Sequence, residues 1–187
     1  MKNSIATLFV CFIAFVNVTN AQTQKSKFEA LTKEFLAGYF KASPIGATQT
    51  GVHDYDSLID DISPLAQEIE AKRLMSFKGR LKEINPKQLS PNAAIDYGML
   101  GESIDEALFS INELKEYEWN PLNYTRDIGN AIASIIYQEF APLDVRMKAV
   151  AGRLRRIPQY VEQAKGLLKN PPRMHVETAI RQNQGNI

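Results

Sequence analysis

Residues Ser90–Tyr117 read SPNAAIDYGMLGESIDEALFSINELKEY and carry the clearest structural signal in this chain of 187 residues. Ser90 is suited to cap a helix, and Pro91 is suited to its first turn. Apolar side chains then recur every three or four residues, at Tyr97, Leu100, Ile104, Leu108 and Ile111. This spacing places one apolar stripe along an α-helix, so the stretch predicts a helix that packs against other helices.

The same periodicity appears in five further segments, which are separated by prolines and polar turns. They span residues 27–42, 63–84, 128–140, 144–168 and 174–182. Pro158 falls inside the fourth of these segments and is expected to kink or restart the helix. No run of alternating β-branched residues bounded by turn residues is present in the sequence. The chain is therefore predicted to be all-α, an antiparallel array of about six helices.

The composition excludes several classes of protein. Hydrophobic residues make up 44% of the chain and charged residues 23%, with a net charge of +1, which is typical of a globular protein. The balanced charge favours neither nucleic acid nor an anionic membrane as a partner. Cys11 is the single cysteine, and the two histidines, His53 and His175, lie far apart in the sequence. We therefore expect no catalytic residue, no metal site and no cofactor in this chain.

The first 21 residues are predicted to be a secretory signal peptide. Lys2 precedes an apolar run, Ile5–Val16, and a polar stretch that ends in Ala21 follows it. A run of this length spans only about 18 Å as a helix, less than the roughly 30 Å of a membrane's hydrocarbon core. A lipoprotein signal is disfavoured because Val10, which is not small, precedes Cys11. Cleavage would leave residues 22–187 as an exported helical segment, periplasmic or extracellular and free of the membrane.

The loop at residues 50–56, TGVHDYD, is the best candidate for a binding site. It brings an imidazole, carboxylates and a phenol together, and His53, Asp54 and Tyr55 are predicted to contact a substrate. The alternative is a structural turn, in which Asp54 and Asp56 cap backbone N–H groups and His53 packs against a helix end. The sequence leaves both possibilities open.

Two other groups of residues are interpreted as structural. Arg153, Arg155 and Arg156 follow one another on an otherwise amphipathic helix and are predicted to form a solvated face. On the same helix, Leu154 is expected to face the interior. Trp119, beside a proline turn, is interpreted as an anchor of its loop against the core. None of these residues is expected to carry chemistry.

Short motifs along the chain together resemble the N-terminal region of a bacterial family known as domain of unknown function 885. They include aromatic residues of the first helix, the His53 loop and several proline turns. In chain order they are Phe35, Tyr39, Phe40, Pro44, Ala47-Thr48, Gly51, His53-Asp54-Tyr55-Asp56, Leu58, Asp61, Ser63, Ser90, Asp96-Tyr97, Trp119-Asn120-Pro121, Arg153-Leu154, Ile157-Pro158, Ala164, Pro171-Pro172 and Glu177-Thr178-Ala179-Ile180. The resemblance covers about residues 27–183.

The resemblance implies a considerably longer protein, related to zinc metallopeptidases of the gluzincin type. In such proteins the C-terminal half carries a His-Glu pair, a Pro-Gly-His motif and a further Glu, and none of these motifs occurs in this chain. Zinc in that missing part would polarise the scissile carbonyl and activate water. The chain would then be the N-terminal part of a larger α-rich fold and form one wall of a peptide-binding cleft. Its partner would be the missing catalytic portion.

The end of the sequence agrees with this expectation, because the predicted helix at residues 174–182 is followed by only a few polar residues and Ile187. We therefore expect a truncated domain that is not catalytic alone. The alternative is a protein of a different class, a stand-alone helical module in the periplasm that binds or scaffolds other molecules without chemistry. A continuation of the reading frame that carries the zinc motif would distinguish the two.

Overall fold

The computed structural model describes the backbone of residues 2–185 and the side chains of residues 22–185. Within that part of the chain every regular element is a helix, which confirms the predicted all-α fold. The predicted signal peptide, residues 1–21, lies outside the described side chains. Among the described residues, no helix is both long enough and apolar enough to cross a membrane.

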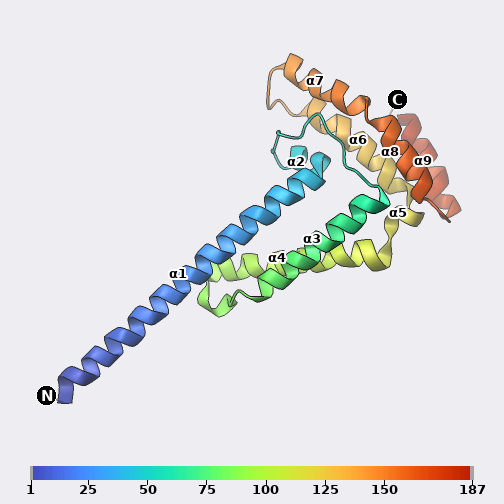
Figure 1. Cartoon of the computed structure of the whole chain (residues 1–187). Helices are drawn as coiled ribbons and strands as arrows, with labels where there is room; N and C mark the ends of the chain where they lie inside the picture. The colour runs from blue at the N-terminus through green and yellow to red at the C-terminus, as the bar shows by residue number, and fades with distance from the viewer. Residues whose placement is uncertain (1, 186–187) are drawn as a thin grey trace. The chain divides into compact units, whose positions relative to one another are not determined.

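The helices follow one another along the chain as Figure 1 shows, from blue at the N-terminal end to red at the C-terminal end. They are α1 (Lys2–Ala42), α2 (Pro44–Gln49), α3 (Pro64–Lys82), α4 (Pro91–Phe109), α5 (Glu116–Trp119), α6 (Pro121–Tyr137), α7 (Leu143–Leu154), α8 (Ile157–Leu167) and α9 (Arg173–Gly185). The chain divides into two compact units. The first combines Met1–Phe35 with Arg73–Ala107, and the second combines Leu36–Lys72 with Leu108–Ile187.

The first unit is held together by aromatic and aliphatic side chains of α1, α3 and α4. Phe28, Leu31 and Phe35 form the buried stripe of α1. Phe35 meets Phe77 of α3 edge to face, with ring centroids 5.3 Å apart. The apolar spacing of residues 27–42 also predicts burial of Leu36 and Tyr39, and this is wrong, because both side chains are exposed. The buried stripe therefore ends with the part of α1 that belongs to the first unit.

The second unit is built around α6, which contacts α2, α7, α8 and α9. One apolar cluster joins the loop before α3 to α6 and α8, and it consists of Ile62, Tyr124, Tyr160, Ala164 and Leu167. A second cluster joins α6 to α7 and consists of Ile135, Ala149 and Val150. Both clusters use one face of α6, so this helix positions the elements that carry the polar side chains described below.

Several helix boundaries differ from the predicted ones. The helix expected at 128–140 begins at Pro121, because the Asn120 side chain caps it by accepting from the Leu122 N–H, and it ends at Tyr137. The helix expected to reach residue 117 loses its α geometry after Phe109, and a π-helical turn, Ser110–Leu114, follows. Lys115 then adopts a left-handed conformation with φ of 47°. Trp119 donates from its indole N–H to the Leu114 carbonyl and so anchors this turn.

Two prolines lie at helix boundaries, as predicted. Pro44 ends the first helix as expected, but it also begins the short helix α2, which was not predicted. The segment 144–168 is divided as expected near Pro158, into α7 and α8. The break falls after Leu154, because Pro158 occupies the first turn of α8 and favours a new helix start there.

Candidate functional site

Helix α7 turns two arginines toward the interior of the second unit. Arg153 is fully buried and Arg146 is 8% exposed, whereas Arg155 is exposed and Arg156 half-buried. The prediction that Arg153 belongs to a solvated face is therefore wrong, and Leu154, which was expected inside, is 52% exposed. The reason is that positions 146, 149–150 and 153 form the buried stripe of α7 at helical spacing.

The Arg153 guanidinium makes hydrogen bonds to segments that are distant in the sequence. Its Nε donates to the Leu58 carbonyl at 2.8 Å, and Nη1 donates to the Ala131 carbonyl at 2.6 Å. Its Nη2 donates to the Pro44 carbonyl at 3.1 Å and to the Thr48 hydroxyl at 2.6 Å. A buried charge is tolerated only when it is hydrogen-bonded and compensated. Arg153 thus holds α2, α6, α7 and the loop before α3 together.

The hydrogen bonds continue from Arg153 to the predicted binding loop. Thr48 donates from Oγ1 to Asp56 Oδ1 at 2.6 Å, and Asp56 Oδ2 lies 3.0 Å from His53 Nδ1. Asp56 is itself buried, so its charge and that of Arg153 compensate each other. Burial lowers the pKa of Arg153, while the nearby carboxylates of Asp56 and Asp60 act in the opposite direction. We call the chain Arg153–Thr48–Asp56–His53 the Arg153 network.

The His53 ring is held from two directions. It stacks on Phe140, which lies in the loop between α6 and α7, with ring centroids 3.6 Å apart and planes 10° apart. Its Nδ1 faces the Asp56 carboxylate, so in the neutral ring Nδ1 carries the proton and Nε2 is an acceptor. A histidine oriented in this way by a carboxylate is the arrangement found at many metal and catalytic sites.

The three predicted site residues have different surroundings. His53 belongs to the Arg153 network, whereas the side chains of Asp54, which is exposed, and Tyr55, which is half-buried, make no hydrogen bond within the described part of the chain. Asp56 bonds to the side chains of Thr48 and His53 rather than to the backbone N–H groups that a capping role requires. Their contact with a substrate stays a prediction.

The loop lies directly against α7 at a glycine. A Cβ atom added at Gly152 would lie 2.8 Å from the Cβ of Ser57 and 2.9 Å from its carbonyl oxygen. Both distances are shorter than van der Waals contact allows. Only glycine therefore permits the segment that follows His53 to approach the helix at this point.

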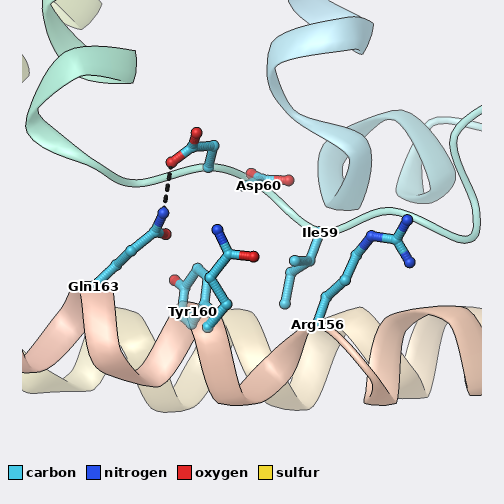
Figure 2. A pocket seen from close by; sticks show the side chains of 7 residues that line it. Ile59, Asp60, Arg156, Tyr160 and Gln163 are labelled. Carbon is cyan, nitrogen blue, oxygen red and sulfur yellow. Dashed lines mark hydrogen bonds between the residues drawn. The ribbon is translucent and has the colours of Figure 1, made fainter.

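A second polar site lies beside this loop, between the extended segment 59–61 and α8 (Figure 2). It is an open pocket of about 130 Å³, lined by Ile59, Asp60, Asp61, Arg156, Gln159, Tyr160 and Gln163. Gln163 connects the two walls, because its Nε2 donates to Asp61 Oδ1 at 2.8 Å and its Oε1 accepts from the Ile62 N–H at 3.4 Å. We call it the α8 pocket.

Two carboxylates are enclosed around the α8 pocket. Asp60 accepts from Ser43 Oγ and from the Ile45 N–H, each at 2.9 Å, and Asp127 accepts from the Tyr160 hydroxyl at 2.9 Å. Burial raises the pKa of Asp60, and the negative charge of Asp127 adds to the effect. Burial likewise raises the pKa of Asp127 and that of Tyr160. The site therefore disfavours further negative charge.

The sequence patterns did not reveal Arg153, Asp60 or Tyr160 as site residues. Asp60 occurs next to Asp61 in a loop without periodicity, and Tyr160 falls in the segment 144–168, where the apolar spacing predicted only a helix. Within residues 22–185, no group of three or more His, Cys, Asp or Glu side chains is placed to hold a metal ion. A zinc site elsewhere in a longer protein stays a prediction.

Comparisons with known proteins show that the chain is similar to a bacterial family and to a solved structure. The family described as "Bacterial protein of unknown function (DUF885)" matches residues 44–187. A structure from Shewanella oneidensis, described as that of a "putative lipoprotein of unknown function", shares the fold with a TM-score of 0.80 and 28% sequence identity. The match covers 86% of this chain and 29% of that one, so this chain spans less than a third of its length. Among curated proteins, none matches the chain significantly.

Proposed function

This chain belongs to the DUF885 family, and on that basis we propose that it is the exported N-terminal segment of a longer metallopeptidase-like hydrolase and forms one wall of its substrate cleft. The length of the Shewanella oneidensis relative supports a longer parent, because most of that chain has no counterpart here. Its description as a lipoprotein favours export, as does the predicted signal peptide at residues 1–21.

The observation that carries the proposal is the Arg153 network. It places a charged guanidinium and a carboxylate in the interior, at a cost in desolvation, and thereby fixes the position of the His53 loop. A loop held rigidly on a helical scaffold is where binding residues are commonly found. In this proposal His53, Asp54 and Tyr55 contact a peptide, with His53 Nε2 accepting from an N–H group.

Zinc would be supplied by the missing C-terminal portion, where it would polarise the scissile carbonyl and activate water. The described residues contain no ligand set for it, so this chain would contribute binding and orientation only. The alternative is a stand-alone binding module. It is favoured by the α8 pocket, whose lining residues all belong to the second unit of this chain.

The DNA that follows the codon for Ile187 tests the proposal directly. We expect the reading frame to continue and to encode a His-Glu pair followed by Pro-Gly-His. An immediate stop codon, with no such motif encoded downstream, would contradict the proposal and leave the stand-alone module.

Three replacements in the full-length protein test the His53 loop. Asp54→Ala and Tyr55→Phe remove groups that make no hydrogen bond within the described chain, and His53→Asn keeps a donor for Asp56 while it removes Nε2. Each is expected to lower the turnover of a mixed peptide substrate about tenfold or more, equivalent to about 1.4 kcal/mol of transition-state stabilisation. Thermal unfolding should change little for Asp54→Ala and Tyr55→Phe.

The matched control is Glu102→Ala, which removes an exposed carboxylate on α4 that has no partner in the described chain. It should leave both turnover and stability unchanged. Parental turnover per folded molecule in all three loop variants would remove the loop from the substrate cleft.

A further inference from the structure

We propose that the α8 pocket binds the amino-terminal ammonium group and first peptide group of a peptide, with Asp60 and Asp61 facing the ammonium. This site is distinct from the His53 loop and lies within the second unit. The inference therefore applies to this chain whether or not it belongs to a longer hydrolase.

The size of the pocket suits a small group. Its volume of about 130 Å³ is well below the roughly 300–1,000 Å³ of sites for drug-sized ligands. Figure 2 shows Gln163 and Tyr160 of α8 and Arg156, which directly precedes α8, on one side, and Asp60 and Ile59 on the extended segment opposite. An extended chain end placed between these walls would meet polar groups from both.

The charges that line the pocket favour a cation. Two carboxylates, Asp60 and Asp61, line it together with one guanidinium, that of Arg156, whose Nη1 already donates to the Gly152 carbonyl. The charge of Asp127, behind Tyr160, adds negative potential. Hydrogen bonds from Ser43 and Ile45 hold the Asp60 carboxylate in place, yet each carboxylate oxygen has a further lone pair. An ammonium group would offset the unfavourable burial of this charge.

The remaining groups favour a peptide over a simple amine. The Gln159 side chain makes no hydrogen bond within the described chain. The backbone groups of residues 59–61 make none to any other described backbone group. Amides and a guanidinium are suited to the N–H and C=O groups of a peptide bond. A simple alkylamine would satisfy the carboxylates but leave these donors and acceptors to water.

A binding experiment with the purified chain tests the proposal. The probe is Ala-Ala amide, compared by calorimetric or NMR titration with its N-acetylated form and with butylamine. We expect saturable binding of the free-amine peptide, and at least tenfold weaker binding of the acetylated peptide and of butylamine. Equal binding of the acetylated peptide would overturn the role of the ammonium group. Equal binding of butylamine would overturn the role of the peptide group, and no saturable binding would overturn the proposal as a whole.

Variants then locate the site. Asp60→Asn should weaken binding of Ala-Ala amide at least tenfold, but it also alters the contacts to Ser43 and Ile45 that hold the fold.

Gln159→Lys avoids this difficulty, because Gln159 is exposed on α8 and the change introduces a tethered ammonium group at the pocket. This variant should also bind Ala-Ala amide at least tenfold more weakly than the parent. Gln138→Lys, at an exposed position after α6, adds the same charge elsewhere and should bind as the parent does. Undiminished binding by Gln159→Lys would place the peptide outside the α8 pocket.

Discussion

Replacing Arg153 with Ala is expected to lower the free energy of unfolding of the second unit by about 3–5 kcal/mol, the usual cost of removing one partner of a buried charge pair. The change leaves the buried Asp56 carboxylate uncompensated and deprives the Leu58, Ala131 and Pro44 carbonyls of their donor. A loss of this size is a large fraction of the roughly 5–15 kcal/mol that stabilises a typical domain.

Urea unfolding monitored by the fluorescence of Trp119 measures this effect, because Trp119 is the only tryptophan and lies in the second unit. The matched control is Arg155→Ala, which removes the same side chain from an exposed position of the chain two residues away. It should change the stability by less than about 0.5 kcal/mol. Arg153→Lys keeps the charge but lacks the planar set of donors, so its stability should fall between the two. If Arg153→Ala and Arg155→Ala unfold at the same urea concentration, the Arg153 network does not stabilise the fold.

Replacing Gly152 with Ala is expected to destabilise the second unit by about 1–3 kcal/mol, although the same change inside a helix is normally favourable. The added methyl group would overlap Ser57, at 2.8 Å from its Cβ and 2.9 Å from its carbonyl oxygen. Part of this contact is with backbone, so no change of side-chain rotamer relieves it. The segment that carries His53 must move away from α7.

The control is a second Gly→Ala replacement that should raise the stability instead of lowering it. Gly166, on α8, has no atom within 4 Å of an added Cβ. Gly166→Ala should therefore stabilise the protein by a few tenths of a kcal/mol up to about 1 kcal/mol, through helix propensity alone. Thermal unfolding of the two variants side by side gives opposite shifts if the close approach is real. Equal shifts would mean that the loop accommodates the methyl group without cost.

The helices were predictable because burial of an apolar stripe imposes its spacing on the sequence, as Tyr97, Leu100 and Ile104 show. The start of α6 was misplaced because Asn120-Pro121 was interpreted as a turn. It has the same cap-and-proline signature as Ser63-Pro64 and Ser90-Pro91, which were correctly assigned to helix starts. The π turn that ends α4 was not predicted, because the apolar spacing of residues 97–111 continues through it.

The site was harder to predict than the fold. The residue types of the His53 loop predicted a binding site, but the partner of the His53 ring, Phe140, lies in a distant loop that no local pattern connects to it. Arg153 was assigned to solvent because arginine is rarely buried. The small residues Ala149 and Gly152 on the same helix were the available signal, since they mark the side on which another segment comes close.

The Arg153 network also bears on the order in which the protein folds. The Ala131 carbonyl lies only 22 residues before Arg153 in the chain, whereas Leu58, Thr48 and Pro44 lie 95, 105 and 109 residues before it. Helices α6 and α7 can therefore pair early, because only a short loop has to close. The acceptors in residues 44–58 can reach Arg153 only when a much longer loop closes. Until these acceptors bind it, the Arg153 guanidinium stays hydrated. We therefore expect the docking of residues 44–58 to be a late step of folding, in which the Arg153 guanidinium loses its water while the longest loops close.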